Sequence, residues 1–286
     1  MTAFEDITIG KSSIPSLAFT VILMIAIPVT FFVCWRVKHK TRTNIGYLIA
    51  GAVGFIVSAR MLELGVHYVC ILADNPVSRF INGNTAVYVL YGIVMAGVFE
   101  ECGRYVVLKH ILKKNRTREN AVLYGIGHGG IEVWIVLLPA MVSYLVIAIR
   151  FSGGNTEEAL NALKITEETA AAALPSVQAA AAFDSAAAVM NVTERLFAML
   201  IHIGLTVIVY YGVQSAKKGL LPLAILLHML ADTFPALYQR GVIQLWAVEL
   251  WAALCSAVIV FIAVRLYRNM NEQTTQESLS SAECSG

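Results

Sequence analysis

Long apolar runs alternate with short polar connectors over most of the chain. A helix needs roughly 20 apolar residues to cross a bilayer, and runs of that length recur along the whole sequence. The pattern therefore predicts an all-α, polytopic transmembrane helical bundle with about seven transmembrane helices. The runs fall at residues 15–36, 45–73, 85–109, 120–149, 192–214, 219–237 and 242–267.

Basic residues concentrate in every second connector. They lie in 36–42, in 109–118, at Lys217 and Lys218, and at the end of the last run. Cytoplasmic connectors of membrane proteins carry an excess of Lys and Arg. Seven spans place all these connectors on one side, so we expect an outside N-terminus and a cytoplasmic C-terminus in a multi-pass protein of the cell (cytoplasmic) membrane.

Composition supports the membrane assignment. The 286 residues are 58% hydrophobic and 14% charged, which is too apolar for an ordinary soluble domain. The net charge of +2 gives no support for nucleic-acid binding. The five cysteines have no metal-knuckle spacing and form no disulfide framework.

The polar stretches outside the spans set the domain boundaries. We interpret residues 1–270 as a single integral membrane domain, with an extracytoplasmic loop at about 150–191. That loop is rich in Ala, which favours helix, so short surface helices are expected there. The Ser-rich and Gln-rich residues 271–286 are predicted to form a short disordered cytoplasmic tail.

Ionisable residues occur inside four consecutive spans, where they are costly and usually functional. Residues four apart lie on one helix face, as do Glu100 with Arg104 and His228 with Asp232. Because helix direction alternates, these groups reach similar depths, and we expect one interior site in the cytoplasmic half of the bilayer. The predicted site residues are Glu100, Glu101, Arg104, His128, His202, His228 and Asp232, with Glu132 in support.

Carboxylates and imidazoles together point to activation of water. A desolvated glutamate can act as a general base, and histidines can stabilise an oxyanion or pass a proton. Asp232 is placed to fix the tautomer of His228. The glycines around His128 serve either close helix packing or substrate access. A second polar stripe, Arg60, Glu63 and His67, is interpreted as structural pairing within the bundle.

Four of these motifs, in this order, resemble the YhfC family of bacterial membrane proteins. The motifs are Phe99 to Arg104, Tyr124 to Glu132, the His202 helix, and His228 to Asp232. That family belongs to the superfamily of PrsW, the CAAX-processing and bacteriocin-processing membrane proteases, and the Aph subunit of gamma-secretase. The resemblance covers about 45–267, with Tyr124 in a position where the superfamily has Phe and Arg104 in the place of a Lys.

The resemblance implies an intramembrane endopeptidase in which Glu100 activates water, with Tyr124 as a supporting residue and no metal or other cofactor required. Zinc is possible, and its ligands would then be His128, His202 and His228. The expected partners are the bilayer and a membrane-embedded or membrane-tethered peptide. Two other functions stay open on the sequence: a non-catalytic membrane scaffold subunit, and a proton or metal-ion transporter.

Overall fold

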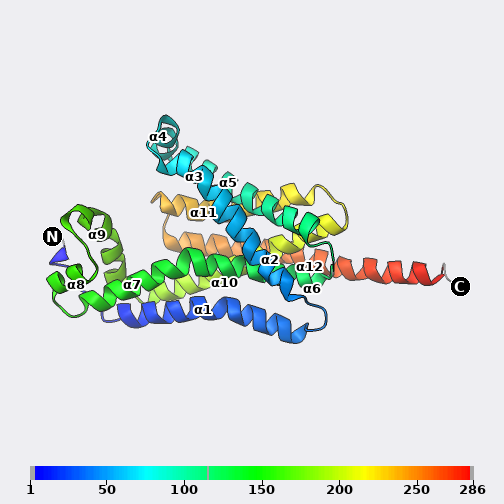
Figure 1. Ribbon diagram of the computed structural model, residues 1–286, viewed down its shortest axis with the longest axis horizontal. Helices are drawn as coiled ribbons and strands as arrows, with labels where there is room; N and C mark the ends of the chain where they lie inside the picture. Colours follow the sequence, from blue (N-terminus) through cyan, green and yellow to red (C-terminus); the bar gives the residue numbers. More distant parts are fainter. Residues whose placement is uncertain (1–3, 115, 284–286) are drawn as a thin grey trace. The chain divides into compact units, whose positions relative to one another are not determined.

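The computed structural model describes residues 4–114 and 116–283, with side chains described as far as Met270 (Figure 1). Every regular element among these residues is a helix. In this described part of the chain, seven helices are long and apolar enough to cross a membrane. The prediction of an all-α, multi-pass bundle is confirmed, while the orientation of the termini stays a prediction.

The first three spans lie between residues 13 and 111 and are joined by short connectors. The second and third contain π-helical segments, in which each turn takes in an extra residue. Their elements are α1 (Ser13–Lys38); α2 (Ile45–Phe55), η2 (Ile56–Glu63), α3 (Leu64–His67) and η3 (Tyr68–Leu72); and, after α4 (Pro76–Gly83), α5 (Thr85–Val106) with η4 (Val107–Ile111).

The remaining four spans follow the basic connector at residues 112–117. The fourth is again interrupted by a π-helical segment, and the last belongs to a helix that runs past residue 270. Their elements are α6 (Arg118–Glu132), η5 (Val133–Leu137) and α7 (Leu138–Phe151); α10 (Ser185–Gln214); α11 (Leu220–Gln239); and α12 (Leu245–Glu283).

Asparagine caps fix where two of the central helices begin. The Asn44 side chain accepts a hydrogen bond from the Gly46 amide at the start of α2. Asn84 does the same for the Val87 amide at the start of α5. Each cap satisfies an amide that has no partner inside the helix, and so specifies the first residue of a span.

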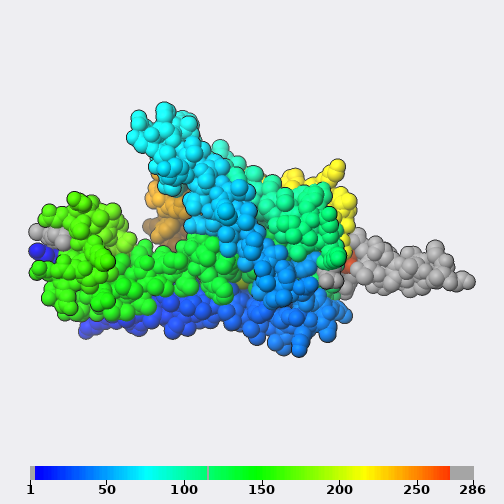
Figure 2. Space-filling view, viewed as in Figure 1, coloured from blue at the N-terminus to red at the C-terminus, as the bar shows by residue number. Residues whose placement is uncertain are grey.

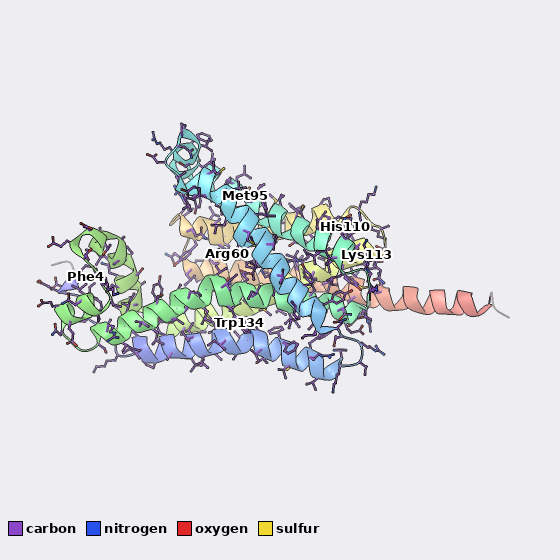
Figure 3. The ribbon with its side chains drawn as sticks, viewed as in Figure 1. Phe4, Arg60, Met95, His110, Lys113 and Trp134 are labelled. Atoms are coloured by element: carbon purple, nitrogen blue, oxygen red, sulfur yellow. The ribbon has the colours of Figure 1, made fainter. Side chains whose placement is uncertain are left out.

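The described chain forms two compact units. The first comprises residues up to 29 and residues 132–195. It contains α7, α8 (Thr156–Ala162) and α9 (Glu167–Ala182), so the loop at about 150–191 does fold into short helices, as predicted. A small core buries Phe4, Phe151, Leu160 and Val177, and Phe4 is labelled in Figure 3.

The second unit comprises residues 30–131 and those from 196 onward. In it α5 packs against α11, which also packs against α12. In the space-filling view, α4 protrudes from the surface of this unit (Figure 2). Two units were not expected from the sequence, and the single membrane domain ending at residue 270 stays a prediction. Residues 284–286 of the predicted disordered tail lie outside the described residues, and α12 includes 271–283.

Glycines let α6 approach its neighbours in the second unit. A Cβ on Gly127 would lie 2.0 Å from the Leu48 carbonyl oxygen of α2. A Cβ on Gly125 would lie 2.6 Å from the Cα of Ile203 on α10. These distances leave room only for hydrogen atoms, so of the two roles considered for the glycines the structure favours close helix packing.

Candidate functional site

Three charged side chains of α5 are buried in the second unit. Glu100 is 7% exposed, and Glu101 and Arg104 are 0% exposed. Both carboxylate oxygens of Glu101 lie close to Nη1 of Arg104, at 2.6 and 2.7 Å. Their spacing of three residues brings them together on one helix face. The arginine therefore neutralises Glu101 within α5 itself.

His128 of α6 is the partner of Glu100. Its Nε2 lies 2.9 Å from Oε2 of Glu100, and the ring is completely buried. A carboxylate only accepts, so Nε2 carries the ring proton and donates it. The ring of Phe55 packs edge-on against the imidazole, with 5.1 Å between the ring centroids, and the ring of Tyr124 stacks on it, with 6.3 Å between the centroids. Aromatic contacts and the glycine packing of α6 thus hold the ring against the acid.

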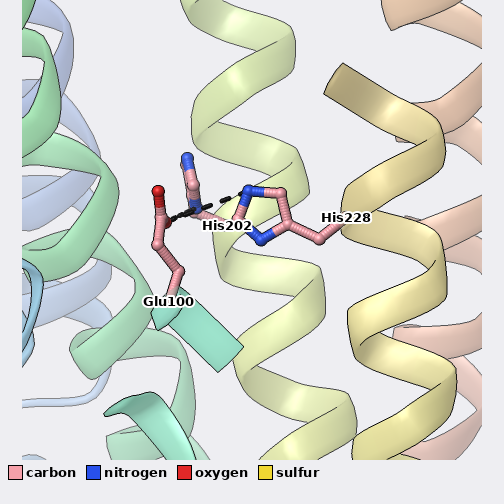
Figure 4. A group of neighbouring side chains, drawn as sticks. All are labelled: Glu100, His202 and His228. Atoms are coloured by element: carbon pink, nitrogen blue, oxygen red, sulfur yellow. Dashed lines mark ion pairs between the residues drawn. The ribbon is translucent and has the colours of Figure 1, made fainter. Parts of the chain in front are cut away.

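Two more histidines face the same carboxylate from α10 and α11. Nδ1 of His202 and Nε2 of His228 each lie 3.9 Å from Oε2 of Glu100 (Figure 4). One ligand atom from each of these three buried residues lies within 4.8 Å of the others. Helix α5 and the two consecutive helices α10 and α11 therefore bring one carboxylate and two imidazoles to a single point.

Acidic partners orient His228. Its Nδ1 lies 2.8 Å from Oε1 of Glu101, and its Nε2 lies 3.4 Å from Oδ2 of Asp232. The Nδ1–H donates to Glu101, which turns Nε2 toward Glu100 and Asp232. Arg104 places Nη2 3.3 Å from Nδ1 of His202, so the same guanidinium supports both Glu101 and His202.

The similarity to known proteins agrees with this geometry. Residues 23–253 match the family model described as "YhfC intramembrane metalloprotease". This chain belongs to the YhfC family. The family match confirms the resemblance on which the sequence analysis relied, and it supports an intramembrane protease in general.

A YhfC relative in Bacillus subtilis (strain 168), described as "Uncharacterized membrane protein YhfC", is 30% identical over 261 residues. The alignment covers 91% of this chain and 98% of the relative. No solved structure matches the chain. The site must therefore be interpreted from its own geometry.

All seven residues predicted for the interior site come together in the second unit. The two supporting residues differ from them in their contacts. Glu132 forms an ion pair with Arg195 at 3.6 Å within the first unit, so its support of the site stays a prediction. The Tyr124 hydroxyl is buried and has no hydrogen-bond partner among the described residues.

The second polar stripe behaves largely as interpreted. His67 pairs with Glu63 at 3.3 Å and lies 2.8 Å from the Tyr91 hydroxyl of α5, which ties the second span to the third. Arg60, labelled in Figure 3, is exposed instead of sharing this buried face. Arg60 and Glu63 both belong to the π-helical segment η2, whose wider turn takes residues three apart off a common face; hydrophobic periodicity did not reveal this segment.

Two buried residues were not recognised in the sequence. Phe55 looked like an ordinary apolar residue, and only the packing of α2 against α6 shows that it contacts His128. Arg195 lies near the start of the predicted run at 192–214, but α10 begins earlier, at Ser185, and Arg195 is buried. The Ala-rich sequence before residue 192 was the available signal for a longer helix.

The structure suggests a different set of zinc ligands from the one expected from the sequence. Sequence reasoning named His128, His202 and His228, but the described residues gather Glu100 in place of His128. One carboxylate with two imidazoles is a usual donor set for catalytic zinc, and Glu101 fixes the ring of His228 in the way that outer partners of zinc ligands do. The residues therefore fit such an ion, with His128 as the outer partner of Glu100.

Proposed function

We propose that this protein is an intramembrane endopeptidase in which Glu100 activates water to hydrolyse a peptide bond of a membrane-associated substrate. The observation that carries the proposal is the buried Glu100 carboxylate, 2.9 Å from His128 and 3.9 Å from His202 and His228. Such a cluster inside a membrane span is costly and has few structural uses. Membership of the YhfC family supports the same reaction class.

The ion pairs distinguish the two adjacent glutamates. Glu101 holds Arg104 at 2.6 and 2.7 Å and His228 at 2.8 Å, so its negative charge is already compensated by the guanidinium. Glu100 instead faces imidazoles. We therefore assign the general base to Glu100 and a positioning role to Glu101.

The proposed reaction has two proton transfers. Glu100 takes a proton from water, and the water oxygen attacks the carbonyl carbon of the scissile bond to give a tetrahedral intermediate. His128 holds one oxygen of Glu100 and leaves the other for the water. When the C–N bond breaks, the proton on Glu100 passes to the leaving amine.

The developing negative charge needs donors that are already in place. His228 is held by Glu101 on one ring nitrogen and faces the reacting region with the other. In its doubly protonated form it would donate to the oxyanion, with Asp232 balancing the imidazolium. Arg104 keeps His202 oriented toward the same region.

A zinc ion, if this protein uses one, would be held by Glu100, His202 and His228. When bound, it would supply a Lewis acid that polarises the substrate carbonyl. In that case Glu100 would be a ligand instead of the base. The two forms of the proposal therefore assign different roles to Glu100 and respond differently to chelation.

The site's depth sets the class of substrate. Its groups belong to helices that qualify as membrane spans, so the scissile bond must enter the bilayer. We propose a membrane-embedded or membrane-tethered peptide as substrate. The basic connectors support our proposal that the site lies in the cytoplasmic half of the bacterial cell membrane.

The test compares wild type with Glu100→Gln in proteoliposomes that contain candidate membrane peptides. Cleavage should fall by at least on the order of 100-fold, since a general base contributes that much or more. Glu63→Gln is the matched control, because Glu63 is also 7% exposed, lies in a span and pairs with a histidine. Unchanged cleavage in Glu100→Gln would reject Glu100 as the general base. Absence of cleavage by the wild type would instead favour the scaffold or transporter functions.

A chelator arm separates the two forms of the proposal. The water-activating form predicts full cleavage after treatment with a strong chelator, and no zinc retained through purification. The zinc form predicts loss of cleavage that added zinc restores. It also predicts zinc in the wild type, measured by elemental mass spectrometry, that His202→Ala removes.

A further inference from the structure

A cavity of about 380 Å³ lies in the second unit, away from the Glu100 cluster. It is formed where η4, the end of α10 and the start of α11 meet. In Figure 2 these segments, coloured green and yellow, lie side by side. Its lining includes Lys109, Val209, Val213, Lys217, Lys218 and Leu221.

The polar part of this cavity is cationic. Lys109, Lys217 and Lys218 are exposed, and no Asp or Glu lines the cavity. Lys109 donates to the Tyr105 hydroxyl at 2.6 Å, and Lys217 lies 5.3 Å above the Tyr211 ring. Within the described part of the chain, none of the three ammonium groups forms an ion pair. Three positive charges therefore face one cavity without a protein anion.

The rest of the lining is apolar and lies near the ends of two membrane spans. Val209 and Val213 lie in the last two turns of α10, and Leu221 lies in the first turn of α11; both helices qualify as membrane spans. The cavity thus lies where hydrocarbon meets water. Basic connectors, including the one with His110 and Lys113 labelled in Figure 3, predict this side to be cytoplasmic.

We propose that this cavity binds the headgroup and upper acyl chain of an anionic phospholipid. The lysine rim matches the phosphate, and the apolar floor matches the chain. A free phosphate would use only the rim, and an acidic soluble peptide would leave the floor unfilled. The cytoplasmic leaflet of a cell membrane supplies anionic lipid beside the cavity.

The bound lipid would link three helices of the bundle. The cavity is lined by Tyr105 of α5 and by residues of α10 and α11, and these three helices carry Glu100, His202 and His228. Tyr105 follows Arg104 directly on α5, and Leu221 lies two turns before His228 on α11. A ligand that binds only the folded arrangement raises its stability. Anionic lipid should therefore stabilise the whole protein against unfolding.

The experiment measures lipid binding to the full-length protein in a neutral detergent. Phosphatidylglycerol, phosphatidylcholine and inorganic phosphate are titrated separately, and bound molecules are counted by native mass spectrometry. We expect saturable phosphatidylglycerol binding that is absent with phosphatidylcholine and that inorganic phosphate does not displace. A lysine near the membrane surface contributes about fivefold in affinity, so changing all three to Gln should weaken binding on the order of 100-fold.

The matched control removes three lysines that do not line the cavity: Lys40→Gln, Lys113→Gln and Lys114→Gln. They are exposed and lie in basic connectors on the same predicted side. The control should bind phosphatidylglycerol as wild type does and keep the increase in melting temperature that the lipid produces. Equal losses of phosphatidylglycerol affinity in both triple variants would overturn the proposed site and show only a diffuse charge effect. Equal binding of phosphatidylcholine, or displacement by inorganic phosphate, would also overturn it.

Discussion

Gly127→Ala tests whether close packing of α6 holds the site together. The new Cβ would lie 2.0 Å from the Leu48 carbonyl oxygen, 2.8 Å from its carbonyl carbon and 3.0 Å from its Cα. All three are backbone atoms of α2, so no side-chain rotation can relieve the clash. The helices themselves must separate.

The size of the separation follows from these distances. Ordinary contact begins at 3.4 Å, so the gap must widen by about 1.4 Å, the difference between 3.4 and 2.0 Å. Overpacking of this kind costs about 1–3 kcal/mol, and higher helix propensity returns up to about 1 kcal/mol. Because the clash is with backbone atoms we take the upper end of the cost, about 3 kcal/mol, and subtract about 1 kcal/mol, so we expect a net loss of about 2 kcal/mol. The next residue, His128, would also move relative to Glu100, which lies 2.9 Å away.

The assay is equilibrium unfolding in micelles or bicelles, with cleavage or metal content measured on the folded fraction. Gly92→Ala is the control, because a Cβ there meets nothing within 4 Å and the residue lies in the same unit on α5. That variant should be as stable as wild type or gain up to about 1 kcal/mol. If Gly127→Ala matched Gly92→Ala in stability, the close contact of α2 with α6 would not be what positions His128.

Three further outcomes follow from the ion pairs and backbone. Arg104→Gln leaves Glu101 buried without its cation and should cost about 3–5 kcal/mol in unfolding free energy, most of which a second change, Glu101→Gln, should recover. Arg79→Gln breaks a pair whose side chains are 68% and 82% exposed, and should leave the melting temperature unchanged. Lys164→Gly relieves a φ of 55° and should raise the free energy of unfolding by up to about 1 kcal/mol, measured by equilibrium unfolding, because removing the left-handed strain outweighs the added freedom of the unfolded chain.

The helical bundle and the meeting of the seven site residues could be predicted from short-range rules. Apolar run length gave the spans, and four-residue spacing placed His228 with Asp232 on one face. These rules act within a helix, and the ion pair that results is seen at 3.4 Å.

The detailed neighbours could not be predicted, because they depend on contacts between helices. Glu100 forms the three-residue group with His202 and His228, and His128 contacts Glu100 from outside that group. This arrangement follows from how closely α6 packs against α2 and α10. The periodicity argument also assumed a constant number of residues per helical turn. The π-helical η2 breaks that assumption and moves Arg60 out of the stripe that contains Glu63 and His67.

The pairing of Glu101 with Arg104 inside one helix bears on how the protein enters the membrane. An Arg or Asp at the centre of an inserting helix costs about 2.5–3.5 kcal/mol. α5 compensates two of its three charges before any later helix exists, since both partners lie within one turn. His128, His202 and His228, which approach Glu100, are all synthesised afterwards. Insertion of α5 can thus precede assembly of the site, and the arrival of the histidine helices completes the environment of Glu100.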